Sequence, residues 1–208
     1  MRYLAAFVVL VLLAAQASSQ QPDQKPQGTQ SKNGGGAIVY SEGGAFLIEG
    51  PKGWTTDHEV GQELGVCCVF YPEGTTWDNA QTVMYPNVVT KGPGQKTLKE
   101  FMDHDVADFR EHNPGMTYVD GEDLPLNRSR TAKLRYFYGV NKNSAEAVAY
   151  VDEDKIIAVI VASSRTTKAL NDSIPLLRTV LRTYAYMDVK FAKGAKPATG
   201  QPFKLPND

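Results

Sequence analysis

Two adjacent cysteines, Cys67 and Cys68, are the most conspicuous pair of side chains in the sequence. They lie in an apolar run over residues 66–71 that ends at Pro72, a pattern that predicts a β-strand. Successive side chains of a strand point to opposite faces, so the two thiols are expected in different layers of the core. The sequence gives no base a fixed position beside them. We therefore interpret both as core thiols that resist alkylation in the native state, rather than as a nucleophile or a redox site.

A possible metal-binding pattern is formed by His104, Asp108 and His112, which follow one another at intervals of four residues. On a helix these positions drift across about 80° of the surface, so the three side chains do not converge on one ion. A closed metal site needs three or four convergent ligands, so helix salt bridges explain the spacing better. The sequence therefore predicts no metal ligand and no cofactor.

Asp105 is unusual because it falls on the apolar stripe of the same predicted helix. A carboxylate in that position must be paired or lie at the edge of the interface, and Arg135 is a candidate partner. A catalytic acid is the alternative interpretation. The sequence contains no nucleophile-elbow, zinc-protease, phosphate-loop or dinucleotide motif, so it assigns no catalytic residue.

The overall composition is that of a globular protein. The 208 residues are 42% hydrophobic and 22% charged, and 22 basic against 23 acidic residues give a formal charge of -1. This balance excludes a constitutive nucleic-acid binder, which would carry a basic surplus. Two cysteines also cannot form a disulfide framework.

The first 17 residues resemble a secretory signal peptide. Arg2 precedes an uncharged, mostly apolar run of 13 residues, 3–15, and Ala15-Gln16-Ala17 fits a small-x-small cleavage site. The run is shorter than the roughly 20 apolar residues that span a bilayer. We expect cleavage after Ala17 or Ser19, a secreted or periplasmic location, and no stable membrane insertion afterwards.

The remaining chain divides into a folded centre and two extensions. Residues 18–36 have no large apolar side chain and contain five glutamines, which predicts a disordered linker. Residues 189–208 are expected to form a flexible basic tail. Residues 37–188 are then one globular domain, in which 15 basic minus 21 acidic residues give a charge of -6.

Within that domain the apolar periodicity predicts strands and two helices. A capping box of Thr97 and Glu100 begins the first helix, which ends at Asn113-Pro114-Gly115. The second helix is expected over about residues 168–184, with Pro175 starting or kinking it near Asn171 or Asp172. Strands are expected at residues 46–49, 66–71, 82–89, 131–138, 145–151 and 156–162.

The strands also predict how the layers are arranged. The strand over residues 82–89 contains Pro86 and is therefore placed at a sheet edge. The strand over residues 131–138 alternates, so one of its faces is expected to be solvated. Residues 145–151 and 156–162 form an antiparallel hairpin that is apolar on both faces and needs a layer on each side. The prediction is an α/β (α+β) fold, an α/β/α sandwich with a central, mainly antiparallel sheet.

This order of elements, together with the segment Phe46-Leu47-Ile48-Glu49-Gly50-Pro51-Lys52-Gly53-Trp54, resembles the PsbP-like superfamily of PsbP and DcrB-like α/β/α domains. The resemblance covers about residues 46–187. The chain departs from the family pattern at residues 183–186 and in an apparent insertion at residues 55–65. The resemblance implies the fold, but it does not imply a ligand, because members bind unrelated partners.

Two functions of different classes remain open. The favoured one is an exported, non-catalytic accessory or binding module of the cell envelope, which binds another envelope or secreted protein through exposed aromatic side chains. The candidate aromatics are Trp77, Tyr71 and Tyr85, whereas Trp54, which is fixed by the preceding turn, is expected to be mainly a structural anchor. The alternative is a small secreted hydrolase with an unlocated active site. Such an enzyme would need a concave pocket in which titratable side chains converge.

Overall fold

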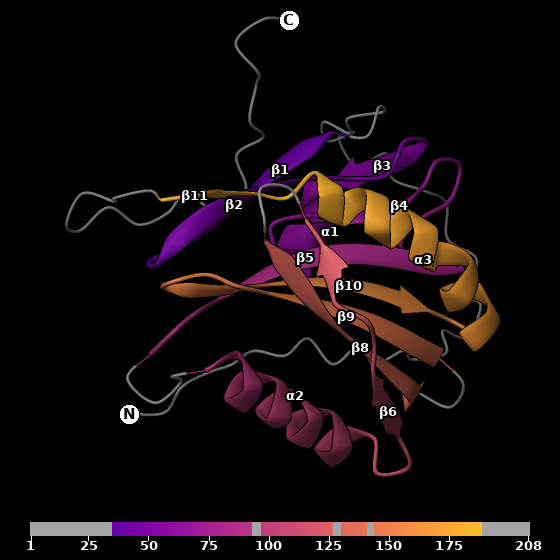
Figure 1. Ribbon diagram of the computed structural model, residues 1–208. Helices are drawn as coiled ribbons and strands as arrows, with labels where there is room; N and C mark the ends of the chain where they lie inside the picture. The colour runs from indigo at the N-terminus through magenta and orange to yellow at the C-terminus, as the bar shows by residue number, and fades with distance from the viewer. Residues whose placement is uncertain (1–34, 93–96, 127–129, 141–143, 189–208) are drawn as a thin grey trace, which may run out of the picture.

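The structure is a computed structural model that describes residues 35–92, 97–126, 130–140 and 144–188 (Figure 1). The predicted signal peptide, all but the last two residues of the predicted linker, and the predicted tail lie outside the described residues. In the described part of the chain, no helix is both long enough and apolar enough to cross a membrane.

The centre of the fold is an eight-stranded sheet in which every neighbouring pair is antiparallel. The strand order is β3-β4-β5-β10-β9-β8-β6, with the short β7 also paired to β8. The hairpin of β9 and β10 is confirmed, and it occupies the middle of the sheet. The strands are β3 (Trp54–Asp57), β4 (Val69–Pro72), β5 (Thr82–Thr90), β6 (Thr117–Asp120), β7 (Leu124–Pro125), β8 (Thr131–Val140), β9 (Ser144–Asp152) and β10 (Ile156–Ser164).

A second sheet of three strands was not predicted. It has the order β1-β2-β11 and is formed by β1 (Gly36–Ser41), β2 (Gly44–Glu49) and β11 (Ala185–Met187). The two ends of the folded part meet here, because β2 pairs with β1 on one side and with β11 on the other. In Figure 1 this sheet lies on the same side of the large sheet as the last helix.

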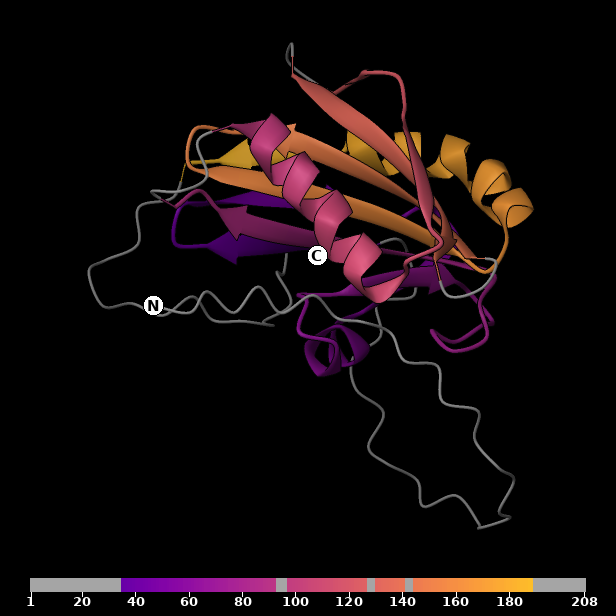
Figure 2. The same cartoon turned by 90° about the horizontal axis from the view of Figure 1, so that it is seen from below.

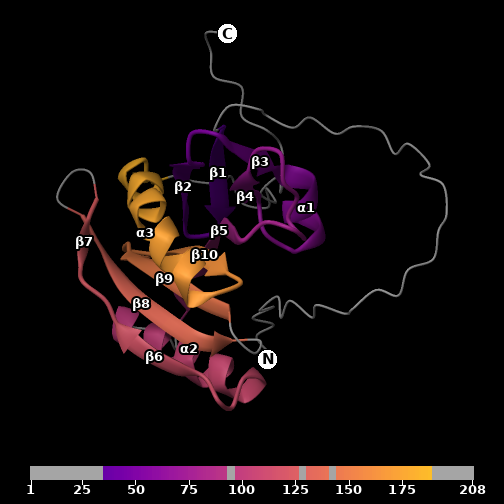
Figure 3. The ribbon, with the colours of Figure 1, turned by 90° about the vertical axis from the view of Figure 1, so that its right-hand side faces the viewer.

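Helices cover both faces of the large sheet, which confirms the sandwich. Helix α2 (Leu98–His112) lies on one face, and α3 (Thr167–Arg182) lies on the other (Figures 1 and 2). The capping box of Thr97 and Glu100 begins α2 as predicted. A third, short helix, α1 (His58–Glu63), was not predicted. It contacts β4 and lies away from α2 (Figure 3). It lies in the segment 55–65 that the sequence marked as an insertion.

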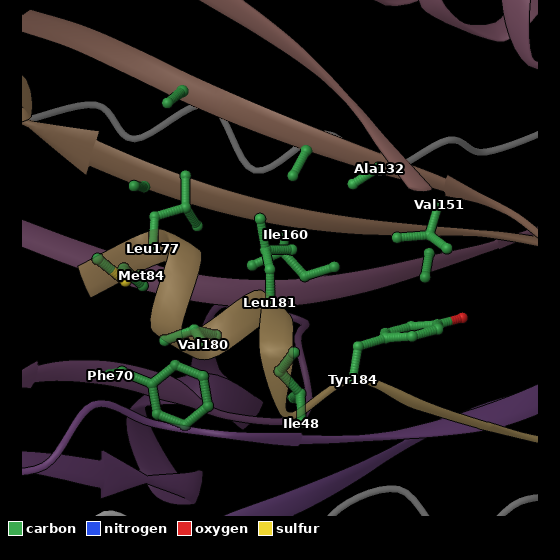
Figure 4. Packing of buried hydrophobic residues seen from close by; sticks show 14 of the residues in the cluster. Ile48, Phe70, Met84, Ala132, Val151, Ile160, Leu177, Val180, Leu181 and Tyr184 are labelled. Atoms are coloured by element: carbon green, nitrogen blue, oxygen red, sulfur yellow. The ribbon is translucent and has the colours of Figure 1, made fainter. Parts of the chain in front are cut away.

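The main core lies between α3, the small sheet and the α3 face of the large sheet. The apolar stripe of α3 points into this space, since its members recur at helical spacing and are fully buried (Figure 4). The helix begins at Thr167, after the Thr166 cap, so Pro175 lies inside it and does not start it. The side chains of α3 that reach this core include Leu170, Leu177, Val180 and Leu181, followed by Tyr184.

Two expectations about strand edges and faces are wrong. β5 is not an edge strand, because it lies between β4 and β10. Its pairing with β4 is limited to Met84, so Pro86, two residues further on, has no paired residue on that side within the described ranges. β8 has no solvated face over its centre, because Arg135 and Phe137 are buried on the side that α2 covers. In both cases another element covers a surface that the local pattern left open.

Removing both extensions is expected to leave the fold intact. Gly36 pairs with Glu49, and the Gly35 carbonyl accepts a hydrogen bond of 3.0 Å from Thr56 Oγ1, so the folded part begins two residues before the predicted boundary. A chain of residues 35–188 keeps every described helix and strand, and it should melt within a few degrees of the full chain in calorimetry. A loss of tens of degrees would contradict this domain boundary.

Candidate functional site

The structure brings the three candidate aromatics, Trp77, Tyr71 and Tyr85, into one cluster on the α2 face of the sheet. The rings of Trp77 and Tyr85 meet edge to face with their centroids 6.1 Å apart, and both side chains are partly exposed. Tyr71 is only 4% exposed, and its hydroxyl donates a hydrogen bond of 2.6 Å to Asp57 Oδ2. Burial, followed by this contact with Asp57, raises the pKa of Tyr71. The expectation of an exposed side chain is therefore wrong for Tyr71, which supports the cluster from beneath.

Trp54, the fourth aromatic considered, is 7% exposed and packs in the main core. Its backbone N–H donates to the Pro51 carbonyl at 3.1 Å, which closes the turn before β3. Its burial agrees with the structural interpretation and removes Trp54 from the set of exposed aromatics.

A partly exposed surface extends from the aromatic pair along β5. Tyr85, Asn87 and Val89 alternate along this strand, so they lie on the same face, and all three are partly exposed. Tyr85 packs against the buried apolar side chains under α2 and also against the buried group around Tyr71 that Trp77 contacts. We call Trp77, Tyr85, Asn87 and Val89 the β5 surface.

The loop that carries Trp77 is fixed by several hydrogen bonds. The Arg165 side chain donates to the Ala80 carbonyl at 3.0 Å and also to the carbonyl of Asp78. The Asn79 side chain accepts from Thr76 N at 2.8 Å, and Arg165 N donates to the Gln81 carbonyl at 2.9 Å. These contacts preorganise the loop, which lowers the entropy that Trp77 would lose on binding.

Two carboxyl groups lie on the same face of the sheet, one from α2 and one from β9. Asp105 is 3% exposed under α2 and accepts a hydrogen bond from the Tyr150 hydroxyl, whereas Glu146 accepts from Ser163 Oγ at 2.8 Å. Burial raises the pKa of Asp105 to about 6 and that of Glu146 to about 7. Burial first, and then the charges of Glu146 and Asp105, also raise the pKa of Tyr85. The charges of both carboxyl groups therefore reach the hydroxyl group of Tyr85.

Asp105 does not have the partner that the sequence suggested. The Arg135 guanidinium binds Asp120 Oδ1 at 2.6 Å and the Met102 carbonyl at 2.8 Å, and it also covers the Tyr118 ring. Asp105 is instead held by Tyr150. A buried carboxyl with a raised pKa is a common feature of general acids, but this one is covered by the helix that carries it.

A depression on the α3 face does not provide the pocket that a hydrolase needs. It is lined by Leu124, Pro125, Arg178, Leu181 and Arg182, with no carboxyl, histidine or cysteine among them. Asp105 and Glu146, the two carboxyl groups with raised pKa values, belong to the α2 face. The depression therefore lies on the opposite side of the sheet from them.

The three possible metal ligands on α2 pair along the helix. His104 Nδ1 is 3.1 Å from Asp108 Oδ2, and His112 Nδ1 is 2.9 Å from the carbonyl of Asp108. Among the residues that the structure describes, no group of three histidine, cysteine or acidic side chains is placed to hold a metal ion.

The cysteines do not lie as predicted. β4 begins at Val69, so Cys67 and Cys68 occupy a bend between α1 and this strand. Their sulfur atoms are 3.5 Å apart, instead of lying in different layers. Cys68 is fully buried, but Cys67 is only half-buried, so the interpretation as a core thiol does not fit Cys67.

The fold that these elements define is an α+β sandwich built on a mainly antiparallel sheet. It is similar to cyanobacterial PsbP from Synechocystis sp. PCC 6803, with 12% identity and a TM-score of 0.48 over 80% of this chain and 98% of that chain. It is also similar to the Saccharomyces cerevisiae Ran-binding protein Mog1p, with 15% identity and a TM-score of 0.47 over 74% and 96% of the two chains. Both matches agree with the PsbP-like resemblance and concern the fold alone. No family model and no curated protein matches the sequence.

Sequence reasoning missed Glu146 and Tyr150 as members of the site. One signal was present, because Glu146 is the only charged residue within the apolar segment 145–151. An acidic side chain in a strand with two buried faces must find a donor or hold its proton. That argument points to Glu146 without the structure, although it does not identify Ser163 as the donor.

Replacing Asp105 by asparagine tests the buried carboxyl. As the pH rises from about 4 to 6, the unfolded chain releases this proton before the folded chain does, so the wild-type protein loses stability. Asp105→Asn should therefore be more stable than wild type by about 3 kcal/mol near pH 8 and equal to it near pH 3.

Chemical denaturation at several pH values measures this difference. Asp103→Asn is the matched control on α2, because Lys99 lowers the pKa of that exposed carboxyl, and its removal should give no stabilisation. Equal stability of Asp105→Asn and wild type across the whole range would show that Asp105 is ionised at no cost.

Proposed function

We propose that this chain is an exported, non-catalytic binding module whose β5 surface binds a protein partner. The observation that carries the proposal is the partly exposed pair of Trp77 and Tyr85 on a preorganised loop. Tryptophan and tyrosine dominate protein interfaces because each buries a large rigid surface with little loss of side-chain entropy.

The charge of the domain favours a partner with basic and apolar groups. Residues 37–188 carry 15 basic and 21 acidic residues, a charge of -6. Glu146 projects from β9 on the same face of the sheet as the β5 surface, and its charge reaches Tyr85. A cationic side chain placed beside Tyr85 would favour the ionised form of Glu146 and would therefore lower its raised pKa.

The proposed location rests on residues 1–17, whose charge, apolar run and small residues fit a cleaved signal peptide. The partner is then another envelope or secreted protein in the same compartment, and the chain acts as an accessory to it. Sequencing the N-terminus of the exported protein tests this point, with a start after Ala17 or Ser19 expected. An uncleaved or intracellular protein would contradict it.

A hydrolase is less well supported. Asp105 and Glu146 have the raised pKa values that acid–base catalysis uses. Asp105, however, is 3% exposed, and its described contacts are with protein groups under α2. Asp105 is better explained as a buried group that Tyr150 satisfies, and Glu146 as a half-buried group that Ser163 satisfies.

Capture from the native envelope or secreted fraction tests the binding function. The full chain serves as bait beside Trp77→Ala and Tyr85→Ala, with Val119→Ala as the control. Val119 is 51% exposed on β6, at the end of the sheet opposite β3. A protein retained by wild type and Val119→Ala should bind each aromatic variant about 30-fold more weakly, as expected for the loss of an interface hot spot. Equal retention by all four baits would exclude the β5 surface.

A further inference from the structure

The bend between α1 and β4 brings two thiols into contact. Cys67 Sγ and Cys68 Sγ are 3.5 Å apart, with the Cys67 thiol placed to donate to Cys68. On a strand the two side chains would point to opposite faces, so this proximity depends on the bend. Both cysteines are free thiols in the structure.

Neighbouring groups fix the backbone of the pair. His58 Nδ1 lies 3.0 Å from the Cys67 carbonyl and carries the proton there, because a carbonyl can only accept. Val66 N donates to the Gly61 carbonyl at 2.9 Å. Gly61 packs so closely that a Cβ on it would lie 2.5 Å from Cys68 Cα. The backbone that carries the two thiols is therefore held in place from both sides.

The two thiols differ in their access to solvent. Cys67 is half-buried, whereas Cys68 is fully buried in the main core. Burial, and then the contact with Cys67, raise the pKa of the Cys68 thiol. An external reagent thus meets Cys67 first, and Cys68 lies behind it at contact distance. An accessible sulfur backed by a second one is the arrangement of an attacking and a resolving cysteine.

We propose that Cys67 and Cys68 form a thiol–disulfide exchange site whose oxidant is a small-molecule or protein disulfide. The Cys67 thiolate, having lost its proton to solvent, attacks one sulfur of the external disulfide, whose S–S bond breaks to release one thiolate. Cys68 then attacks Cys67 Sγ and passes its proton to the departing sulfur, which breaks the mixed disulfide and releases the second external thiol. Two electrons pass from the cysteines to the external disulfide, and the products are a Cys67–Cys68 disulfide and two external thiols.

The product of this exchange is readily reversible. Adjacent Cα atoms are about 3.8 Å apart across a trans peptide, below the roughly 4.4–6.8 Å that disulfides usually span. A bond closed in this ring is strained, and strained disulfides are the easily reduced ones. The site is therefore suited to exchange rather than to permanent cross-linking, and it does not depend on the binding function proposed above.

Oxidation of the full chain by glutathione disulfide, followed by intact-mass measurement, tests the proposal. Native wild type should pass through a form carrying one glutathione and end as a form that has lost two hydrogen atoms. Excess reduced glutathione should reverse the change. A wild-type chain that stays unreacted, or that ends with stable glutathione adducts, would overturn the proposal.

Two variants assign the order of attack. Cys68→Ala should stop at one glutathione on Cys67, and Cys67→Ala should not react until it is denatured. Circular dichroism checks that each variant is folded. If a variant is not folded, the wild-type experiment alone tests the exchange site. Reaction of native Cys67→Ala at the wild-type rate would show that Cys67 is not the attacking sulfur.

Discussion

Replacement of Trp54 by alanine is expected to lower the free energy of unfolding by about 3–5 kcal/mol, the usual cost of truncating a buried aromatic. Trp54 is 7% exposed and packs in the cluster shared by the large sheet, the small sheet and α3. Its removal leaves a cavity at the start of β3, which the Pro51 turn prevents from collapsing. Denaturant unfolding, monitored by circular dichroism, measures the difference.

The same substitution at Trp77 is the matched control. Trp77 is partly exposed, so Trp77→Ala should lower the free energy of unfolding clearly less than Trp54→Ala does. It should instead weaken the binding of the protein partner. A Trp54→Ala protein as stable as wild type would contradict the structural role of Trp54 and return it to the candidate binding residues.

Replacement of Tyr184 by alanine is the second change with a large expected effect, about 3–5 kcal/mol. Tyr184 is fully buried, its ring centroid lies 5.2 Å from that of Phe46, and its hydroxyl donates to Glu153 Oε1 at 3.1 Å. Glu153 also binds Arg130 Nε at 2.8 Å. Tyr184 therefore joins the end of α3 to β2 and to the turn of the central hairpin.

Tyr184→Phe separates the contribution of the ring from that of the hydroxyl. It keeps the packing and leaves Glu153 bound to Arg130, so it should cost only about 1 kcal/mol. Thermal unfolding of the two variants gives the comparison. Equal losses for Tyr184→Phe and Tyr184→Ala would show that the hydrogen bond, rather than the ring, stabilises this junction.

The elements that the sequence predicted correctly are those with strong local signals. Thr97 and Glu100 mark the start of α2 by direct side-chain contacts, and Asp152-Glu153-Asp154 is too short for anything except a hairpin turn. The short strands β1, β3 and β11 were missed for different reasons. β1 forms a tight hairpin with β2, whereas β3 pairs with a strand beyond α1 and β11 pairs with a strand at the other end of the domain. β11 is three residues long and pairs only with β2 in the described structure.

The candidate site shows the same limit at the level of side chains. Tyr71, Trp77 and Tyr85 are near one another in sequence, and the structure does place them together. Their exposure could not be predicted, because it depends on where Asp57 and the loop held by Arg165 lie. The prediction for the cysteines was wrong for a similar reason. The strand begins three residues later than expected, so a bend replaces the alternation of side chains at Cys67 and Cys68.

Photo-cross-linking from the β5 surface is the most direct test of the central claim, that this surface binds a protein partner. A photoreactive phenylalanine analogue replaces Trp77 in one full chain and the exposed Val119 in another, and both are irradiated in the native cells. The account predicts a discrete cross-linked protein from position 77 and none from position 119. The same cross-linked protein from both positions, or from position 119 alone, would contradict it.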